Sequence, residues 1–251
     1  METSTAIWML TSYVIIGLAY FAALTFGLGL VWRIWGYLRT PMPWPEVTTP
    51  APETEGGAVT RVIGDVLLFP NLFKADKLLW AGAWVFHIAL AAILFRHVRY
   101  FTYPVPSLVL YMETVALFFG YLFGLAILYL LWRRLALPRT LYVSGFPDYF
   151  ALMLLGAITG TGLMVSYWAH AYLVDVKAFM LGLLTLHPIS PPFHPLFLIH
   201  FLLVLVLMIY FPFSKLLHAG GIFFSPSRNQ PYEIQKADKI YTNRGNYPIQ
   251  Y

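Results

Sequence analysis

Five long runs of apolar residues, separated by shorter polar or Pro-rich stretches, dominate the pattern of this chain. They lie at about 7–31, 78–98, 107–132, 148–169 and 195–217. Each run is long enough to cross a hydrocarbon core of roughly 30 Å at about 1.5 Å per helical residue. The pattern therefore predicts an all-α integral membrane protein, built as a bundle of five transmembrane helices.

The stretches between these runs predict shorter elements. The segment PMPWPEVTTPAPETEGG (41–57) is too rich in Pro, Thr and Glu for a regular element. Residues 58–74 have helical apolar spacing and are expected along the membrane interface or against a partner subunit, and 171–186 are expected to form a short surface helix. The polar residues from 219 onward show no periodicity, and we expect them to become ordered only against another protein. The predicted domains are a five-span domain over 1–218, with a cytoplasmic loop at 33–77, and a cytoplasmic tail over 219–251 that contacts partner subunits.

Composition and charge support a multi-pass protein of the cytoplasmic membrane. Of the 251 residues, 59% are hydrophobic and only 11% are charged. Most Lys and Arg residues follow the first, third and fifth spans, and only Arg96, Arg99 and Lys177 follow the second and fourth. The positive-inside rule then predicts an N-terminus outside and a C-terminus in the cytoplasm. Because the net charge of +5 is explained by topology, no nucleic-acid partner is expected.

The chain contains no cysteine. This excludes disulfides, iron–sulfur clusters held by thiolates and covalently attached haem within the chain. Any redox cofactor must be held by other side chains.

Histidines occur in pairs on two of the predicted spans. His87 and His97 lie ten positions apart in the second span, and His200 and His218 lie eighteen apart in the fifth. Because these spans run antiparallel, His97 and His200 share the outer level, and His87 and His218 share the inner half of the membrane. Facing imidazoles on neighbouring helices are typical axial ligands of b-type haem. The pattern predicts two haems b, with these four histidines as iron ligands.

The two spacings do not match. Eighteen residues make five whole turns and about 27 Å of helix, whereas ten residues give about 15 Å and a rotation of roughly 80°. We expect Pro212 to kink or end the fifth helix before His218 and so to reduce the difference.

Other interpretations of these residues remain open. Each histidine could simply bond to a neighbouring carbonyl oxygen, and the four could relay protons in a haem-free transporter or channel subunit, or hold metal ions without haem. Arg96 and Arg99 lie beside His97, where they could pair with haem propionates or extend to the interface. The glycines of GAITGTG (156–162) are expected to allow close approach of a helix or a macrocycle.

The histidine spacings resemble those of the gamma subunit of respiratory nitrate reductase, a dihaem cytochrome b. The sequence IYFPFSKLLHAGGIFFSPSRNQ (209–230) is more similar to the DsrM-type cytochrome b of the sulfite-reductase-associated membrane complex, and to its archaeal relative in a heterodisulfide-reductase-like menaquinol-oxidising complex. The resemblance implies a quinone-reactive cytochrome, with menaquinol as substrate. It also implies a cytoplasmic iron–sulfur partner of heterodisulfide-reductase type and further membrane and periplasmic redox subunits, linked to sulfite or sulfate respiration.

The quinol site departs from the nitrate reductase pattern. Gamma subunits place a lysine early in the third span, where this chain has Glu113 instead. Our hypothesis is that Glu113 accepts protons and lines an outer quinol site together with His170, at the end of the fourth span. The alternative is that Glu113 forms an ion pair with Arg96 or Arg99. His187 and His194 are expected at the outer surface.

Overall fold

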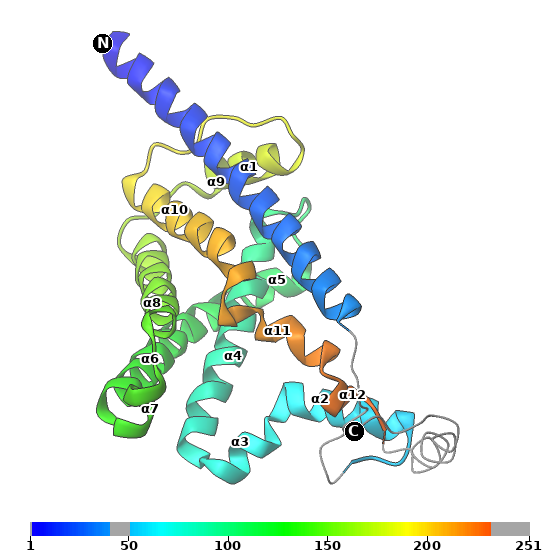
Figure 1. Ribbon diagram of the computed structural model, residues 1–251. Helices are drawn as coiled ribbons and strands as arrows, with labels where there is room; N and C mark the ends of the chain where they lie inside the picture. Colours follow the sequence, from blue (N-terminus) through cyan, green and yellow to red (C-terminus); the bar gives the residue numbers. More distant parts are fainter. Residues whose placement is uncertain (1, 41–50, 232–251) are drawn as a thin grey trace. The chain divides into compact units, whose positions relative to one another are not determined.

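The computed structural model describes residues 2–40 and 51–231, and throughout these ranges the chain is helical or irregular, with no β-strand. Within them, five helices are long and apolar enough to cross a membrane, which confirms the predicted number of spans. Figure 1 labels these helices, which are α1 (Glu2–Arg39), α4 (Lys77–His97), α6 (Glu113–Ala136), α8 (Phe146–Tyr167) and α10 (Pro195–Tyr210).

The chain divides into two compact units. The first comprises residues 1–33 and 76–217, and the second comprises residues 34–75 and 218–251. His87, His97 and His200 therefore belong to the first unit, and His218 opens the last segment of the second.

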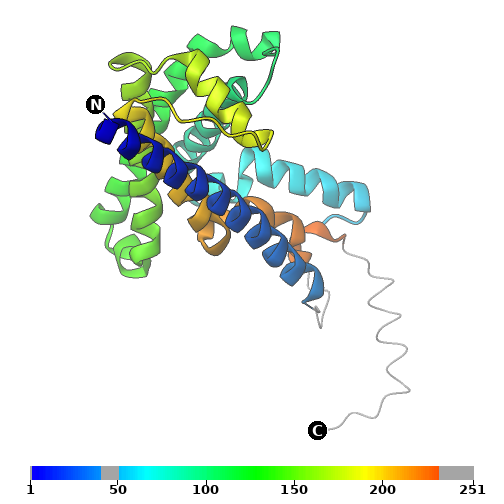
Figure 2. The same cartoon turned by 90° about the horizontal axis from the view of Figure 1, so that it is seen from above.

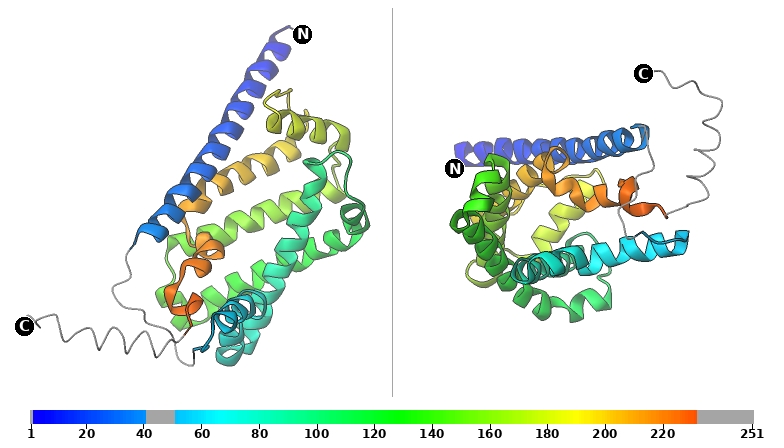
Figure 3. Two further views of the ribbon diagram at one scale, coloured as in Figure 1. Left: turned by 90° about the vertical axis from the view of Figure 1, so that its right-hand side faces the viewer. Right: turned by 60° about the horizontal axis from the view of Figure 1, so that its bottom comes forward.

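The first unit is a row of packed helices. In the part of the chain that the structure describes, α4 packs on α6, α6 on α8 and α8 on α10, whereas α4 and α10 make no comparable backbone contact. The left view of Figure 3 shows α6, α8 and α10 in this order. Helix α1 runs beside α10, as the view in Figure 2 also shows.

Two apolar clusters hold this unit together. One joins α4, α6 and α8 through Phe86, Ala89, Phe123, Ala126, Ile127 and Leu155. The other joins α1 and α10 to the short helix α9 (Leu173–Leu184) through Ile15, Ala19, Ala22, Val176, Phe179, Phe197, Phe201 and Leu205. Between spans that lipid surrounds, close van der Waals packing of such side chains favours association, since the lipid tails are as apolar as the side chains.

Helix α9 was predicted as a surface helix, and the structure corrects this. Its Phe179 is fully buried, with ring centroids 6.4 Å from Phe197 and 5.3 Å from Phe201. The helix is therefore part of the apolar core beside α10, and only its other face is exposed.

The outward faces of the spans are strongly apolar. Leu28, Leu94, Leu125 and Met153, one on each of four spans, all have more than half of their surface exposed. Water-soluble monomers rarely expose contiguous apolar surface on this scale, whereas a bilayer covers it without cost. The exposure pattern agrees with a multi-pass membrane protein.

Two helix boundaries differ from those predicted. The third apolar run is split into α5 (Ser107–Tyr111) and α6, so Glu113 is the first residue of α6. At this position its negative charge interacts favourably with the positive end of the helix dipole. The fifth run does not stay α-helical as far as 217: α10 ends at Tyr210, and η2 (Phe211–Phe213) and η3 (Lys215–Leu217) follow. Pro212 explains this end because its nitrogen carries no hydrogen to donate. The expectation that Pro212 kinks or ends the fifth helix before His218 is therefore confirmed, and the five whole turns of a regular helix do not describe the path from His200 to His218.

The second unit contains short helices from two distant parts of the chain. Besides the end of α1 it holds α2 (Glu55–Leu68), α3 (Pro70–Ala75), α11 (His218–Gly221), η4 (Ile222–Phe224) and α12 (Pro226–Asn229). Arg228 donates to the buried carboxylate of Asp65 at 2.9 Å, and Tyr37 stacks on Phe224. Phe224 and Arg228 of the predicted tail thus contact this chain itself, while its contact with partner subunits stays a prediction. Residues 41–50 and 232–251 lie outside the described residues.

Candidate functional site

His97 and His200 face each other between α4 and α10. His97 is the last residue of α4, and His200 lies in the first half of α10. Their ring centroids are 6.4 Å apart, and the ring planes differ by 23°. The structure therefore brings one of the two predicted histidine pairs together, at a point where the two helices are not in close backbone contact.

The hydrogen bonds of both rings leave the same nitrogen available. Nδ1 of His97 lies 2.7 Å from the carbonyl oxygen of Ile93, and Nδ1 of His200 lies 3.1 Å from the carbonyl oxygen of Ile158. A carbonyl oxygen can only accept, so Nδ1 carries the proton in each ring and Nε2 keeps its lone pair. Donation from one ring nitrogen to a carbonyl is the usual support of a metal-bound histidine.

The spacing of the two rings fits a metal held between them. A metal–imidazole bond is about 2 Å long, so two imidazoles bound on opposite sides of one ion have ring centres roughly 6 Å apart. The observed 6.4 Å agrees with this arrangement. The donor set of two neutral imidazoles, with no thiolate in the chain, fits the axial ligation of a b-type haem.

Gly162 of α8 makes room for the ring of His200. A Cβ atom at this position would lie 3.0 Å from Cε1 and 3.4 Å from Nδ1 of His200. Thr161, the preceding residue, places its Oγ1 3.1 Å from the same Nδ1. The GAITGTG segment thus allows close approach, as expected, and the group that approaches it is the side chain of His200. Helix α8 therefore shapes the space around this ring.

His87 repeats the pattern of His97 ten residues earlier in α4. Its Nδ1 lies 2.7 Å from the carbonyl oxygen of Ala83, four residues before it. The ring of Phe86 meets it edge-on, with centroids 5.2 Å apart. His218, its predicted partner, is the first residue of α11 and belongs to the second unit. The pairing of His87 with His218 therefore stays a prediction.

Arg96 and Arg99 share one carboxylate. Arg99 forms a short hydrogen bond and ion pair with Glu113, and Arg96 Nη2 lies 3.7 Å from the same Glu113 oxygen. Both arginine side chains are largely buried, and Nε of Arg96 is buried without a hydrogen-bond partner among the described residues. Two guanidinium groups against one carboxylate leave one positive charge beside His97. This cluster fits an additional anionic group such as a haem propionate.

The remaining candidate histidines form no hydrogen bond or ion pair with this cluster in the part of the chain that the structure describes. His170 is exposed in the loop between α8 and α9, and within the described chain it has no hydrogen bond or ion pair with Glu113. His187 is exposed with its Nδ1 near the carbonyl oxygen of Thr185, and His194 caps α10 by accepting the Phe197 N–H. Among the described residues, no three His, Cys, Asp or Glu side chains gather as a metal site.

The sequence pattern alone does not indicate Thr161 as a residue of this site. Threonine is common in membrane helices, and nothing in its local sequence points to a contact with a residue thirty-nine positions away. The glycine beside it was the available signal, because a glycine within a helix often marks a close approach.

Comparison with known proteins agrees with the resemblance described above. The family model of the nitrate reductase gamma subunit matches residues 71–232. A protein of Archaeoglobus fulgidus named Hdr-like menaquinol oxidoreductase cytochrome b-like subunit is 34% identical over 257 aligned positions, covering 84% of this chain and 77% of that protein. The protein of the same name from Archaeoglobus profundus is 31% identical over 270 positions, covering 89% and 80%. This chain is therefore a member of the nitrate reductase gamma subunit family.

Proposed function

We propose that this chain is the quinone-reactive dihaem cytochrome b subunit of an anaerobic respiratory complex. It would transfer electrons between menaquinol and a cytoplasmic iron–sulfur subunit of heterodisulfide-reductase type, linked to sulfite or sulfate reduction. The observation that carries the proposal is the facing pair of His97 and His200, in which Nδ1 of each ring lies against a carbonyl oxygen. The names of the two archaeal relatives support menaquinol as the electron donor.

Each haem, once bound, supplies one-electron chemistry, and the residues of this chain hold it in place. His97 and His200 are the proposed ligands of the outer haem, and His87 and His218 those of the inner haem. Arg96 and Arg99 lie beside His97 and would neutralise propionate groups, since their charge is only partly balanced by Glu113. The terms outer and inner follow the distribution of Lys and Arg along the chain, with the N-terminus outside.

The quinol site is proposed at the outer haem. Glu113 is the first residue of α6, and 38% of its side chain is exposed, so a quinol hydroxyl can approach it. Its carboxylate would accept a proton during quinol oxidation, while Arg99 holds it in position. His170, which is also solvent-exposed, would pass protons to the outside. The cytoplasmic partner would be contacted by the second unit, which includes the tail over 219–251.

An absorption spectrum of the purified complex tests the proposal. We expect b-type bands in the reduced-minus-oxidised difference spectrum, and we expect a menaquinol analogue to produce them. His200→Ala and His218→Ala should each abolish one of two haem signals. His187→Ala is the matched control, because His187 is exposed on the outer loop and bonds only its local backbone, so both signals should remain.

Absence of b-type bands would overturn the proposal and favour a haem-free transporter that relays protons through its histidines. Elemental analysis separates a further alternative, since zinc or copper in place of iron would indicate metal ions held without haem.

A further inference from the structure

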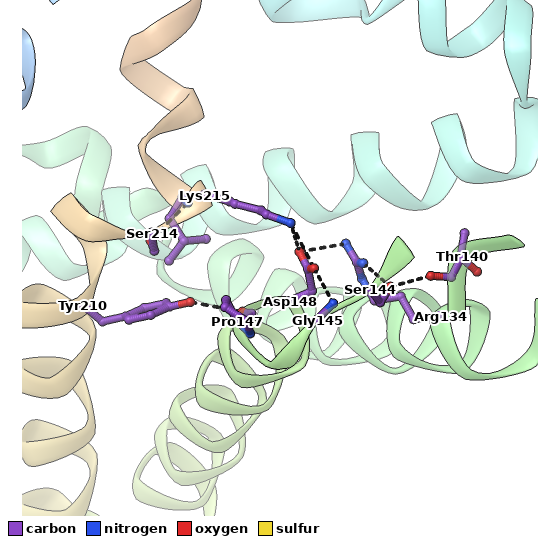
Figure 4. Close-up of polar contacts among 10 residues, drawn as sticks. Arg134, Thr140, Ser144, Gly145, Pro147, Asp148, Tyr210, Ser214 and Lys215 are labelled. Carbon is purple, nitrogen blue, oxygen red and sulfur yellow. Dashed lines mark hydrogen bonds and ion pairs between the residues drawn. The ribbon is translucent and has the colours of Figure 1, made fainter. Parts of the chain in front are cut away.

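The segment that joins α10 to His218 is irregular, yet it is firmly attached to the first unit. Residues 211–217 form two short 3-10 turns, in which the backbone has fewer regular hydrogen bonds than in an α-helix. The direction in which such a segment leaves a helix depends on contacts made by its side chains. Figure 4 shows these contacts, which centre on Asp148 at the start of α8.

Asp148 binds this segment through an ion pair between its buried carboxylate and the exposed ammonium group of Lys215. Its side chain is only 6% exposed, and its two carboxylate oxygens accept from Lys215 Nζ at 2.9 and 3.0 Å. The same carboxylate accepts the N–H of Gly145 at 3.0 Å and lies 3.9 Å from Arg134. A buried carboxylate must be paired, so loss of Lys215 would leave its charge incompletely compensated.

The turn that precedes Asp148 is itself held by side-chain hydrogen bonds. Arg134, near the end of α6, donates to the hydroxyl of Ser144, which in turn donates to the carbonyl oxygen of Thr140. These bonds join the end of α6 to the start of α8 through the short helix α7 (Pro138–Val143). Asp148 therefore lies in a helix start that hydrogen bonds attach to the end of α6, as Figure 4 shows.

Two further contacts restrain the same segment. Tyr210 donates through its hydroxyl to the carbonyl oxygen of Pro147, next to Asp148. Pro212 is fully buried, and α1 approaches it so closely that a Cβ on Gly29 would lie 2.7 Å from the Pro212 ring. Leu217, the last residue of the segment, is also buried. The chain is thus held on both sides up to the residue before His218.

We infer that Asp148 and Lys215 are positioning residues for His218, fixing the point from which its backbone continues. This inference rests on the proposed role of His218 as an axial ligand of the inner haem. His87 is positioned by a regular helix, whereas His218 follows a helix break and needs a separate restraint. The ion pair provides that restraint.

The test compares variants of the purified complex by redox titration and by low-temperature electron paramagnetic resonance of each oxidised haem. The variants Asp148→Asn and Lys215→Met should shift the midpoint potential and the resonance of one haem, and that haem should be the one lost in His218→Ala. Lys215→Arg keeps a cation at this position and should restore both properties towards wild type. The haem of His97 and His200 should stay unchanged.

Asp76→Asn is the matched control. Asp76 pairs with Arg133, the neighbour of Arg134 on α6, but it contacts the start of α4 and not the segment after α10. Both haems should keep their wild-type properties in this variant. The haem properties of Asp76→Asn therefore show whether loss of any ion pair in this region has an effect, or only loss of the Asp148–Lys215 pair before His218.

The possible results distinguish the inference from the proposed function. If His218→Ala loses one haem while Asp148→Asn and Lys215→Met leave both haems unchanged, the positioning role is overturned and the dihaem proposal stands. If the wild-type complex shows no b-type haem, or His218→Ala loses none, the proposed function itself fails. Should Asp148→Asn not fold, Lys215→Met decides, because the Lys215 side chain is 75% exposed and Asp148 keeps Arg134 and the Gly145 N–H.

Discussion

His200 of α10 is hydrogen-bonded to Thr161 of α8, with 3.1 Å between Nδ1 and Oγ1. His87 and His97 instead bond carbonyl oxygens of their own helix, four residues earlier. The orientation of the His200 ring therefore depends on the packing of two helices. A shift of α8 relative to α10 would turn this imidazole, whereas it would leave His97 in place.

Substitution of Thr161 by Val should raise the midpoint potential of the outer haem. An acceptor at Nδ1 makes the imidazole more basic, which stabilises the oxidised iron and lowers the potential. Since a hydrogen bond contributes about 1 kcal/mol net, the shift should be at most about 40 mV for a one-electron couple. Redox titration measures it. Thr161→Ser should keep the wild-type value, as should Thr159→Val, because Thr159 bonds only the carbonyl oxygen of Leu155. A potential that does not change would show that Ile158 alone fixes the ring.

Substitution of Gly162 by Ala should weaken binding of the outer haem. The added methyl group would lie 3.0 Å from Cε1 of His200, so the ring or the helix must move by a few tenths of an ångström. Gly160→Ala is the control, because a Cβ there meets no atom within 4 Å. That change should leave haem content unaltered and stabilise α8 by up to about 1 kcal/mol. Haem content per protein, measured by absorbance, checks both. Equal content in the two variants would contradict the close approach as a determinant of the site.

Substitution of Glu113 by Gln should slow haem reduction by a menaquinol analogue by about 10²-fold, the usual contribution of a general base. Reduction by dithionite should be unaffected, since it requires no proton acceptor. Stopped-flow absorbance separates the two reactions. Asp175→Asn, at an exposed acid in the first turn of α9, should match wild type in both. Quinol-driven reduction at the wild-type rate would remove Glu113 from the mechanism and leave it as the ion-pair partner of Arg96 and Arg99.

Acidification should remove the contribution of Asp76 to stability. The Leu79 N–H, and next the Arg133 guanidinium, lower the pKa of this carboxyl below its usual value. Because the pKa is lower in the folded than in the unfolded state, the stabilisation is complete above the unfolded value of about 4 and is lost as the pH falls through the folded value. The Tm of wild type should exceed that of Asp76→Asn at neutral pH, and the difference should disappear in acid. A difference that is independent of pH would exclude the charge as its cause.

The number and approximate limits of the spans were predictable because lipid imposes a length and an apolar surface on each helix. The positions of the histidines also suggested which rings could meet, and the structure shows His97 beside His200. These features depend on sequence spacing alone. The break after Tyr210 was anticipated from Pro212, although the idea of five whole turns between His200 and His218 assumed a regular helix that does not exist.

Contacts between distant segments were not predictable in the same way. Thr161 beside His200 and Lys215 beside Asp148 are separated by 39 and 67 positions. Each depends on the rotation of a helix about its axis, which apolar periodicity does not determine when a helix is apolar on all sides. The burial of Phe179 was unpredictable for the same reason. The sequence indicated a helix over 171–186, but not which neighbouring residues would cover it.

The end of α10 at Tyr210 has a mechanical consequence. In a continuous helix, a tilt or rotation that moved His200 would be transmitted rigidly through five turns to His218. Because α10 ends at Tyr210, no continuous α-helix joins the two histidines, and the intervening 3-10 segment is restrained separately by α8 and α1. Helix α8 contacts both sides of this break, since Thr161 bonds His200 and Asp148 holds Lys215, so a displacement of α8 would act on His200 and on the segment before His218 together.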